Sequence, residues 1–300
     1  MEMSTPGEWF RLLDMLKDEK GVAILLGATD TGKTTLAKFL ISHLYQQGLR
    51  VALIDADIGQ FFLSPPTTIG LAVFKSPQDW QERPSVEIFF VGSTTPEGHF
   101  PIHLKGVKRM VDKAISYGAE LILIDTTGLV AGEAGMELKR RKIDLLSPRF
   151  ILALQKSGEI EPILELYKEN AVCKILRLPL SDQIRQTSME ERRINRTNEL
   201  RDYFGESVIK EFAIGEVQIE GEALDPSGYA IPLDWLLRSN GLLIGLKDSH
   251  DDTVALGVIR HYSEDKRVVR VSTPLRDAEG IKTIQLGSHR LIPCYEDERF

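Results

Sequence analysis

Cysteine is scarce in this sequence, with only Cys173 and Cys294 among 300 residues. Their spacing fits neither a metal-binding pattern nor a disulfide framework, so we interpret both as small apolar side chains. Apolar runs are short as well, and none approaches the roughly 20 residues needed to cross a bilayer. The first 20 residues form a charged amphipathic stretch, which is not typical of a secretory signal. We therefore expect a cytoplasmic protein that has no membrane partner.

Positive charge is also in deficit, with 37 Lys and Arg against 44 Asp and Glu and a net charge of -7. Such a chain does not coat nucleic acid nonspecifically, so any nucleic-acid contact must be made by a local basic groove. The six histidines show no ligand spacing, and we expect Pro101 to prevent His99 and His103 from sharing a regular helix face. A zinc site is therefore not expected.

The clearest motif present is GATDTGKTT, which follows the apolar run Val22–Leu26 directly. Its spacing is that of a phosphate-binding loop, in which backbone N–H groups converge on an anion. Lys33 is expected to reach the outer phosphates, and the hydroxyl of Thr34 to bind Mg²⁺. The residues predicted to contact the nucleotide are Gly27, Thr29, Asp30, Thr31, Gly32, Lys33, Thr34 and Thr35.

Apolar runs and helical spacing alternate after this loop. Runs at 51–54, 86–91, 121–124, 150–154 and 171–176 read as strands, and 34–47, 104–117 and 160–168 read as helices. This order predicts an α/β fold with a doubly wound, mostly parallel P-loop NTPase sheet over residues 1–205. From about Glu206 the runs are short and β-rich, at 208–220, 241–247, 253–261 and 267–273, which predicts a small C-terminal β-rich domain over 206–300.

Carboxylates follow two of the predicted strands. Asp55 and Asp57 lie in DADIGQ, where alternate residues point the same way and can face the phosphate-binding loop together. One carboxylate can hold hydrated Mg²⁺ while the other accepts a proton from an attacking hydroxyl or orients a water. Asp125, in DTTG, is a further candidate for Mg²⁺. The alternative is that Asp55 or Asp57 merely caps a turn.

An arginine-rich segment spans residues 185–204, and spacing of four places Arg192 and Arg196 on one helix face. Such a row can clamp phosphates and close over them as a lid. Composition equally allows a solvated helix in which glutamates pair with the arginines.

Taken together, these motifs resemble the P-loop polynucleotide 5′-hydroxyl kinases, which include the RNA kinases of tRNA splicing, mRNA 3′-end processing and pre-rRNA processing. The resemblance covers most of 21–204, through GATDTGKTT, DADIGQ with SPPTTIG, VGSTTP, DTTG and the arginine-rich segment ending in RDYF. It implies that Asp57 is the base toward the 5′-hydroxyl and that Asp55 supports Mg²⁺. It also implies that 185–204 is the lid, and that substrate is contacted by Gln60, Thr126, Gly128 and Leu129.

Two positions depart from the family pattern. The T-x-G-W clasp of the family, whose tryptophan can stack on the terminal base, ends here in Leu129. Leucine gives up stacking that is typically worth roughly 1–3 kcal/mol per base. The first lid arginine falls on Thr187, with Arg185 nearby. Nucleotide binding is expected to survive these changes better than RNA phosphorylation does.

The resemblance implies an ATP- and Mg²⁺-dependent phosphotransferase acting on single-stranded RNA or DNA 5′ ends, with Lys33, Asp57, Arg192 and Arg196 as catalytic residues and an RNA-processing protein as a further partner. The alternative is a P-loop ATPase or GTPase that acts as a nucleotide-dependent switch or assembly factor. A guanine-reading N-K-x-D motif is absent, which disfavours guanine selectivity but leaves GTP as an alternative donor.

Overall fold

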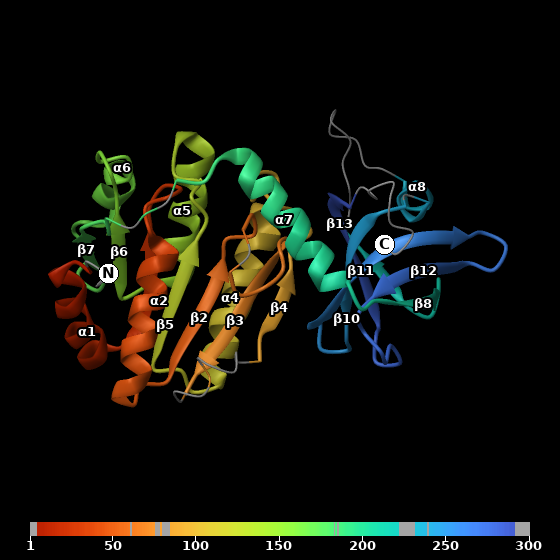
Figure 1. The fold of residues 1–300 in the computed structure, drawn as a ribbon, viewed down its shortest axis with the longest axis horizontal. Helices are drawn as coiled ribbons and strands as arrows, with labels where there is room; N and C mark the ends of the chain where they lie inside the picture. Colours follow the sequence, from red (N-terminus) through yellow and green to blue (C-terminus); the bar gives the residue numbers. More distant parts are fainter. Residues whose placement is uncertain are drawn as a thin grey trace.

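The computed structural model describes residues 5–60, 62–75, 79, 85–182, 184, 186–221, 232–238 and 240–291. Figure 1 shows a layered α/β body with helices on both faces of a sheet, and further strands beyond its β4 edge. None of the helices in these ranges combines the length and the apolar composition needed to cross a membrane.

Five parallel strands form the centre of the α/β body. They run in the order β7-β6-β1-β5-β2. Their bounds are β1 (Gly21–Leu26), β2 (Val51–Ala56), β5 (Leu121–Thr126), β6 (Phe150–Leu154) and β7 (Lys174–Leu178). The predicted doubly wound sheet is thus confirmed. It continues through β3 (Thr68–Phe74) and β4 (Glu87–Phe90), each antiparallel to the strand before it.

Helices cover both faces because successive residues of the buried strands point in opposite directions. Leu25 of β1 packs into a core with α1 (Gly7–Glu19) and α2 (Lys33–Leu44), which is extended by η1 (Tyr45–Gln47). Ile24 packs into the opposite core, with α4 (Phe100–Ser116), α5 (Gly132–Leu146), α6 (Glu161–Leu164) and η2 (Glu165–Tyr167). Because the five central strands are parallel, their carboxyl ends lie at one edge of the sheet, which is where ligands bind in such folds.

One expectation about α4 is wrong. Pro101 does not prevent a helix that includes His103, because it lies in the first turn, where a missing N–H breaks no helical bond. His99 is the N-cap and accepts a hydrogen bond at its carbonyl from His103 N. His103 is fully buried and its Nε2 lies 3.1 Å from Ala56 O, so it is a core residue.

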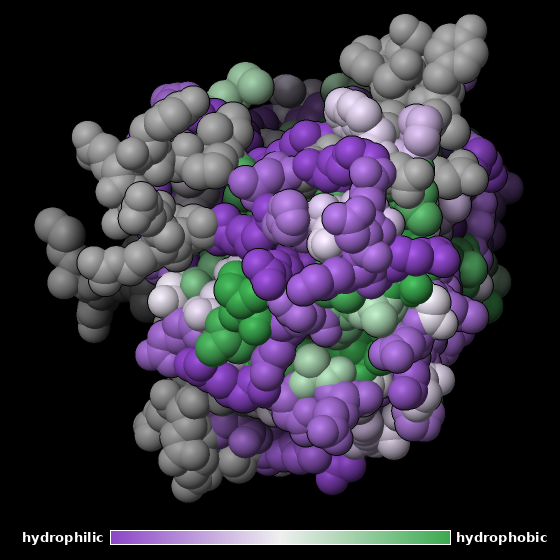
Figure 2. Space-filling view, turned by 90° about the vertical axis from the view of Figure 1, so that its right-hand side faces the viewer, coloured by the Kyte–Doolittle hydropathy of each residue, from purple (hydrophilic) through white to green (hydrophobic). Residues whose placement is uncertain are grey.

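The later strands follow α7 (Met189–Phe204). They are β8 (Val208–Ala213), β9 (Gln218–Glu220), β10 (Leu242–Lys247), β11 (Thr253–Ser263), β12 (Val268–Thr273) and β13 (Thr283–Arg290), with α8 (Leu233–Leu237) among them. They enclose a core of their own, although β11 joins the main sheet by pairing Thr253 with Ile88 of β4. Figure 2 views the molecule from this side and shows a largely hydrophilic face interrupted by smaller hydrophobic areas. A domain boundary at 205/206 stays a prediction.

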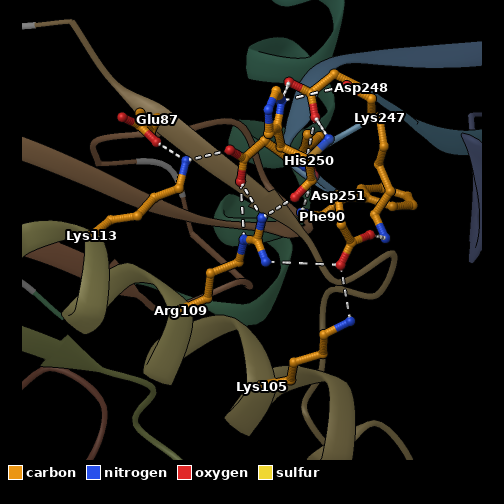
Figure 3. A network of polar contacts seen from close by, with 12 residues as sticks. Glu87, Phe90, Lys105, Arg109, Lys113, Lys247, Asp248, His250 and Asp251 are labelled. Carbon is orange, nitrogen blue, oxygen red and sulfur yellow. Dashed lines mark hydrogen bonds and ion pairs between the residues drawn. The ribbon is translucent and has the colours of Figure 1, made fainter. Parts of the chain in front are cut away.

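An ion-pair network joins α4 to the loop between β10 and β11 (Figure 3). Arg109 Nη2 lies 2.7 Å from Asp252 Oδ1, and Lys113 Nζ lies 2.8 Å from Asp252 Oδ2. Lys105 Nζ lies 3.1 Å from Asp251 Oδ2. Because Arg109, Lys113 and Asp252 are all mostly shielded from solvent, these contacts are screened less than surface pairs and fix the later strands against α4.

Candidate nucleotide and phosphoryl-transfer site

The phosphate-binding loop joins β1 to α2 at the carboxyl edge of the sheet. It turns through two residues with left-handed backbone, Asp30 with a φ of 55° and Gly32 with a φ of 82°. Thr31 Oγ1 donates a 2.8 Å hydrogen bond to Ala28 O. A Cβ on Gly27 would lie 2.3 Å from Leu154 O, so the loop approaches β6 too closely for any side chain there. These contacts make the turn compact, as expected of a phosphate-binding loop.

Lys33 begins α2 and is 7% exposed. Its Nζ donates a 2.8 Å hydrogen bond to Ala28 O within the loop. Burial lowers the pKa of Lys33, and the charges of Asp125 and Asp57 oppose that shift. The ammonium group therefore lies within the influence of the carboxylates at the strand ends. Its predicted contact with the outer phosphates stays a prediction.

Thr34 and Asp125 meet where α2 passes the end of β5. Thr34 Oγ1 donates a 2.5 Å hydrogen bond to Asp125 Oδ2, while Asp125 Oδ1 is buried and has no hydrogen-bond partner among the described residues. Burial raises the pKa of Asp125 and the charge of Lys33 opposes that rise. A hydroxyl next to an unpartnered carboxylate oxygen is a donor set that suits Mg²⁺.

Asp55 is held differently, since both of its oxygens accept backbone N–H groups. Oδ1 accepts from Asp57 N at 3.2 Å, and Oδ2 accepts from Leu63 N at 3.1 Å. Burial raises the pKa of Asp55 well above its ordinary value, and the charge of Asp125 adds to this. These contacts fix the turn that follows β2, which corresponds to the turn-capping alternative. The role of Asp55 toward Mg²⁺ stays a prediction.

Asp57 is more exposed to solvent than Asp55 and lies two residues later, just after the end of β2. Its Oδ1 accepts a 3.2 Å hydrogen bond from Gly59 N, and its Oδ2 a 3.4 Å bond from Gln60 Nε2. Its charge acts on Lys33 and on Asp125, so the three groups share one electrostatic environment. The structure thus brings the predicted base and the loop lysine together.

The DTTG segment lies beside the phosphate-binding loop. A Cβ on Gly128 would lie 2.7 Å from Thr29 N, so the two backbones are in direct contact. Leu129 is partly buried. Thr126 is fully buried, and its hydroxyl donates to Leu25 O at 2.8 Å, so its side chain braces β5 against β1. Its predicted contact with substrate stays a prediction.

Two buried lysines of α5, Lys139 and Lys142, were missed in the sequence analysis. Lys139 Nζ donates hydrogen bonds to Thr126 Oγ1 at 2.9 Å and to Thr127 O at 2.5 Å. These bonds hold the DTTG segment against α5. Lys142 Nζ is buried and has no hydrogen-bond partner in the described part of the chain. Sequence offers no signal for them, because lysines on a charged helix such as KRRK normally face solvent.

Most of the segment predicted to be a lid forms a helix, α7, which crosses the carboxyl edge of the sheet (Figure 1). Its action as a lid stays a prediction. Ser188 and Glu191 form a capping box at its first turn. Arg192 Nη2 lies 2.7 Å from Asp30 Oδ2, and Arg196 Nη1 donates to Gly59 O at 3.3 Å. The two arginines thus reach the phosphate-binding loop and the Asp57 turn. Arg185 lies outside the described residues.

The carboxyl end of α7 is anchored among the later strands. Leu200 and Phe204 are buried with Leu243 and Leu256 in one cluster. Tyr203 OH accepts a 3.0 Å hydrogen bond from Leu256 N. The helix therefore connects the phosphate-binding loop at one end to the β-rich part at the other.

Known proteins resemble this chain in sequence and in fold. Residues 27–206 match the family model of the mRNA cleavage and polyadenylation factor CLP1 P-loop. A polyribonucleotide 5′-hydroxyl-kinase of Thermococcus kodakarensis is 31% identical over 89% of this chain and 87% of its own length. One of Methanocaldococcus jannaschii is 30% identical over 95% and 92%. The solved wild-type Clp1p–Pcf11p complex shares the fold, with a TM-score of 0.75 and 15% identity over 96% of this chain and 80% of that one.

Proposed function

Because the chain belongs to the mRNA cleavage and polyadenylation factor CLP1 P-loop family, we propose that it is an ATP-dependent polynucleotide 5′-hydroxyl kinase that phosphorylates RNA 5′ ends. Curated relatives with this activity in their names span most of this chain. The observation that carries the proposal is the convergence of Lys33, Asp57 and the lid arginines at one sheet edge. Because a carboxylate at this place can also orient an attacking water, transfer to an acceptor is what distinguishes this kinase from a hydrolytic switch.

In the proposed reaction the triphosphate of ATP lies in the loop 27–35, with its γ-phosphate toward Asp57. Asp57 accepts the proton of the 5′-hydroxyl while the hydroxyl oxygen forms a bond to the γ-phosphorus. The bond between the γ-phosphorus and the bridging oxygen of departing ADP breaks. Lys33 exchanges Ala28 O for phosphate oxygens. Arg192 and Arg196 stabilise the charge on the migrating group through forked hydrogen bonds.

Thr34 and Asp125 fit Mg²⁺ best, since Asp125 Oδ1 is a buried oxygen without a partner among the described residues. When bound there, Mg²⁺ would neutralise phosphate charge. Asp55 would support this pair indirectly, by holding the turn that carries Asp57, because its own oxygens are engaged by backbone N–H groups.

The acceptor is proposed to be single-stranded RNA, with Gln60, Gly128 and Leu129 beside its terminal nucleotide. Gln60 contacts Asp57, and Gly128 contacts the phosphate-binding loop, so both border the reacting groups. A protein partner in RNA processing is a further proposal, supported by the solved relative bound to Pcf11p.

The test is transfer of labelled γ-phosphate from ATP or GTP, with Mg²⁺, to matched RNA and DNA oligonucleotides bearing 5′-hydroxyls. Wild-type protein should label RNA, whereas Lys33→Ala and Asp57→Asn should not. Lys38→Ala changes an exposed lysine on the same helix and should transfer normally. Free phosphate without labelled oligonucleotide would overturn the kinase proposal and favour the ATPase switch.

A further inference from the structure

Asp30 places a carboxylate inside the loop that binds phosphate, where a negative charge repels the ligand. Its Oδ2 accepts hydrogen bonds from Arg192 Nη2 at 2.7 Å and from Thr187 N at 3.2 Å. The side chains of Asp30 and Arg192 are 18% and 20% exposed, so water screens the pair incompletely. The charge of the loop is thus matched by an opposite charge from the lid.

Arg192 retains donors beyond this ion pair. A guanidinium carries five N–H groups in a fixed plane. Its Nε is buried and has no hydrogen-bond partner among the residues that the structure describes. Arg192 also acts electrostatically on Lys33, so it lies near the group expected to hold the outer phosphates. Fixing one edge of the guanidinium therefore sets the direction of its other N–H groups.

The backbone around Asp30 supports the same orientation. Its φ of 55° is a left-handed conformation that Asp and Asn adopt more readily than most residues. Beside it, a Cβ on Gly32 would lie 3.2 Å from the side chain of Ile184, so the segment that leads into α7 packs on the loop. The loop and the amino end of the lid thus meet through both polar and apolar contacts.

We propose that Asp30 is a positioning residue for phosphoryl transfer, which holds Arg192 so that its remaining N–H groups face the phosphates of bound ATP. This inference rests on the proposed kinase function. Asp30 would thus act on the reaction by orienting Arg192 of the lid, in addition to forming part of the phosphate-binding loop. In this proposal the carboxylate disfavours phosphate binding but orients the arginine that stabilises the transferring group.

Asp30→Asn is the informative variant, because Asn keeps the shape and the left-handed backbone while removing the charge. Misplacement of Arg192 should lower kcat for transfer about 10- to 100-fold. The Kd for ATP should stay equal or fall, since a like charge near the phosphates is gone. A purely structural role in the loop would instead raise the Kd for ATP. Thermal unfolding of the variant checks that it remains folded.

Glu190→Gln provides the matched control. Glu190 pairs with Arg193 on the same helix at 2.7 Å, but both side chains are more than 60% exposed. This variant should keep wild-type kcat and Kd, because exposed pairs on a helix contribute little.

A double-variant cycle tests whether Asp30 acts through Arg192. Asp30→Asn should cost little further kcat in an Arg192→Ala background. Wild-type kcat in Asp30→Asn, or fully multiplicative losses in the double variant, would overturn this inference while leaving the kinase function intact. Absence of transfer by the wild-type protein would instead overturn the kinase function, and this inference with it.

Discussion

Thr34 Oγ1 donates a 2.5 Å hydrogen bond to Asp125 Oδ2, which links the first turn of α2 to the end of β5. The other oxygen, Asp125 Oδ1, is buried and has no hydrogen-bond partner among the described residues. An unpartnered buried carboxylate oxygen is costly unless a ligand satisfies it. The pair therefore explains why a threonine follows Lys33 and why an aspartate lies near the end of β5.

Replacing Thr34 by valine keeps the volume of the side chain and removes the hydroxyl. If the pair holds Mg²⁺, half-maximal transfer in Thr34→Val should require about tenfold more Mg²⁺, because one oxygen ligand is lost. A Mg²⁺ titration of the initial rate measures this, and chelation of the metal should stop transfer by the wild-type protein. Thr197→Val, on the lid helix, is the control. An unchanged Mg²⁺ requirement in Thr34→Val would remove Thr34 from the metal site.

Gly128→Ala tests the contact between the DTTG segment and the phosphate-binding loop. The added Cβ would lie 2.7 Å from Thr29 N, so backbone atoms must shift. Overpacking of this kind costs about 1–3 kcal/mol, which predicts a Kd for ATP raised about 10- to 100-fold. Equilibrium nucleotide binding checks this beside Gly280→Ala, where a Cβ meets nothing within 4 Å. Normal ATP affinity in Gly128→Ala would show that the loop tolerates the displacement.

The sequence was sufficient to predict the parallel sheet and the position of Lys33, because buried strands and the glycine-rich loop leave local patterns. It was not sufficient to predict the helix α5 or the role of its lysines, because these side chains reach the site only through tertiary packing. Nor did it predict β3 or β13. The pairing of Asp30 with Arg192 joins residues 162 positions apart, and no local pattern records such a contact.

The solvated-helix interpretation of α7 describes only one face of the helix, and the phosphate-clamp interpretation of the other face stays a prediction. Arg193 pairs with Glu190 in solvent, as the solvated-helix interpretation expects. Arg192 and Arg196 turn inward to Asp30 and Gly59. Charge spacing predicts which residues share a face, whereas the direction of that face depends on how Leu200 and Phe204 anchor the helix.

Leu129→Trp restores the aromatic residue of the family clasp. Leu129 is only partly buried, and it follows Gly128 directly, which contacts the phosphate-binding loop. Stacking worth roughly 1–3 kcal/mol predicts about tenfold tighter binding of single-stranded RNA ends. Fluorescence anisotropy measures the change, and an abasic 5′ nucleotide should abolish the gain. Leu145→Trp, at an exposed position on α5, is the control. Equal affinity in Leu129→Trp and wild type would mean that no base lies there.

Lys142 predicts an unusual pH dependence of stability. Burial lowers the pKa of Lys142 from its ordinary value of 10.5 to about 7, against the opposing charges of Asp57 and Asp125. His103, whose pKa burial also lowers, and Lys139 lie in the same electrostatic environment. Between pH 7 and pH 10.5 the unfolded chain binds the Lys142 proton more strongly than the folded chain does. The contribution of Lys142 to stability therefore rises with pH across this window.

Lys142→Met removes the buried charge and keeps most of the side-chain volume. The variant should have a higher free energy of unfolding at pH 6.5, by on the order of a few kcal/mol, because the penalty for a buried ammonium is then fully present. The gain should shrink as the pH approaches 10, where the wild-type lysine is neutral in the folded chain. Urea unfolding at both pH values measures this, with Lys17→Met, at an exposed position on α1, as the control. A gain that does not change with pH would mean that Lys142 is already neutral at pH 6.5 and that the methionine simply packs better.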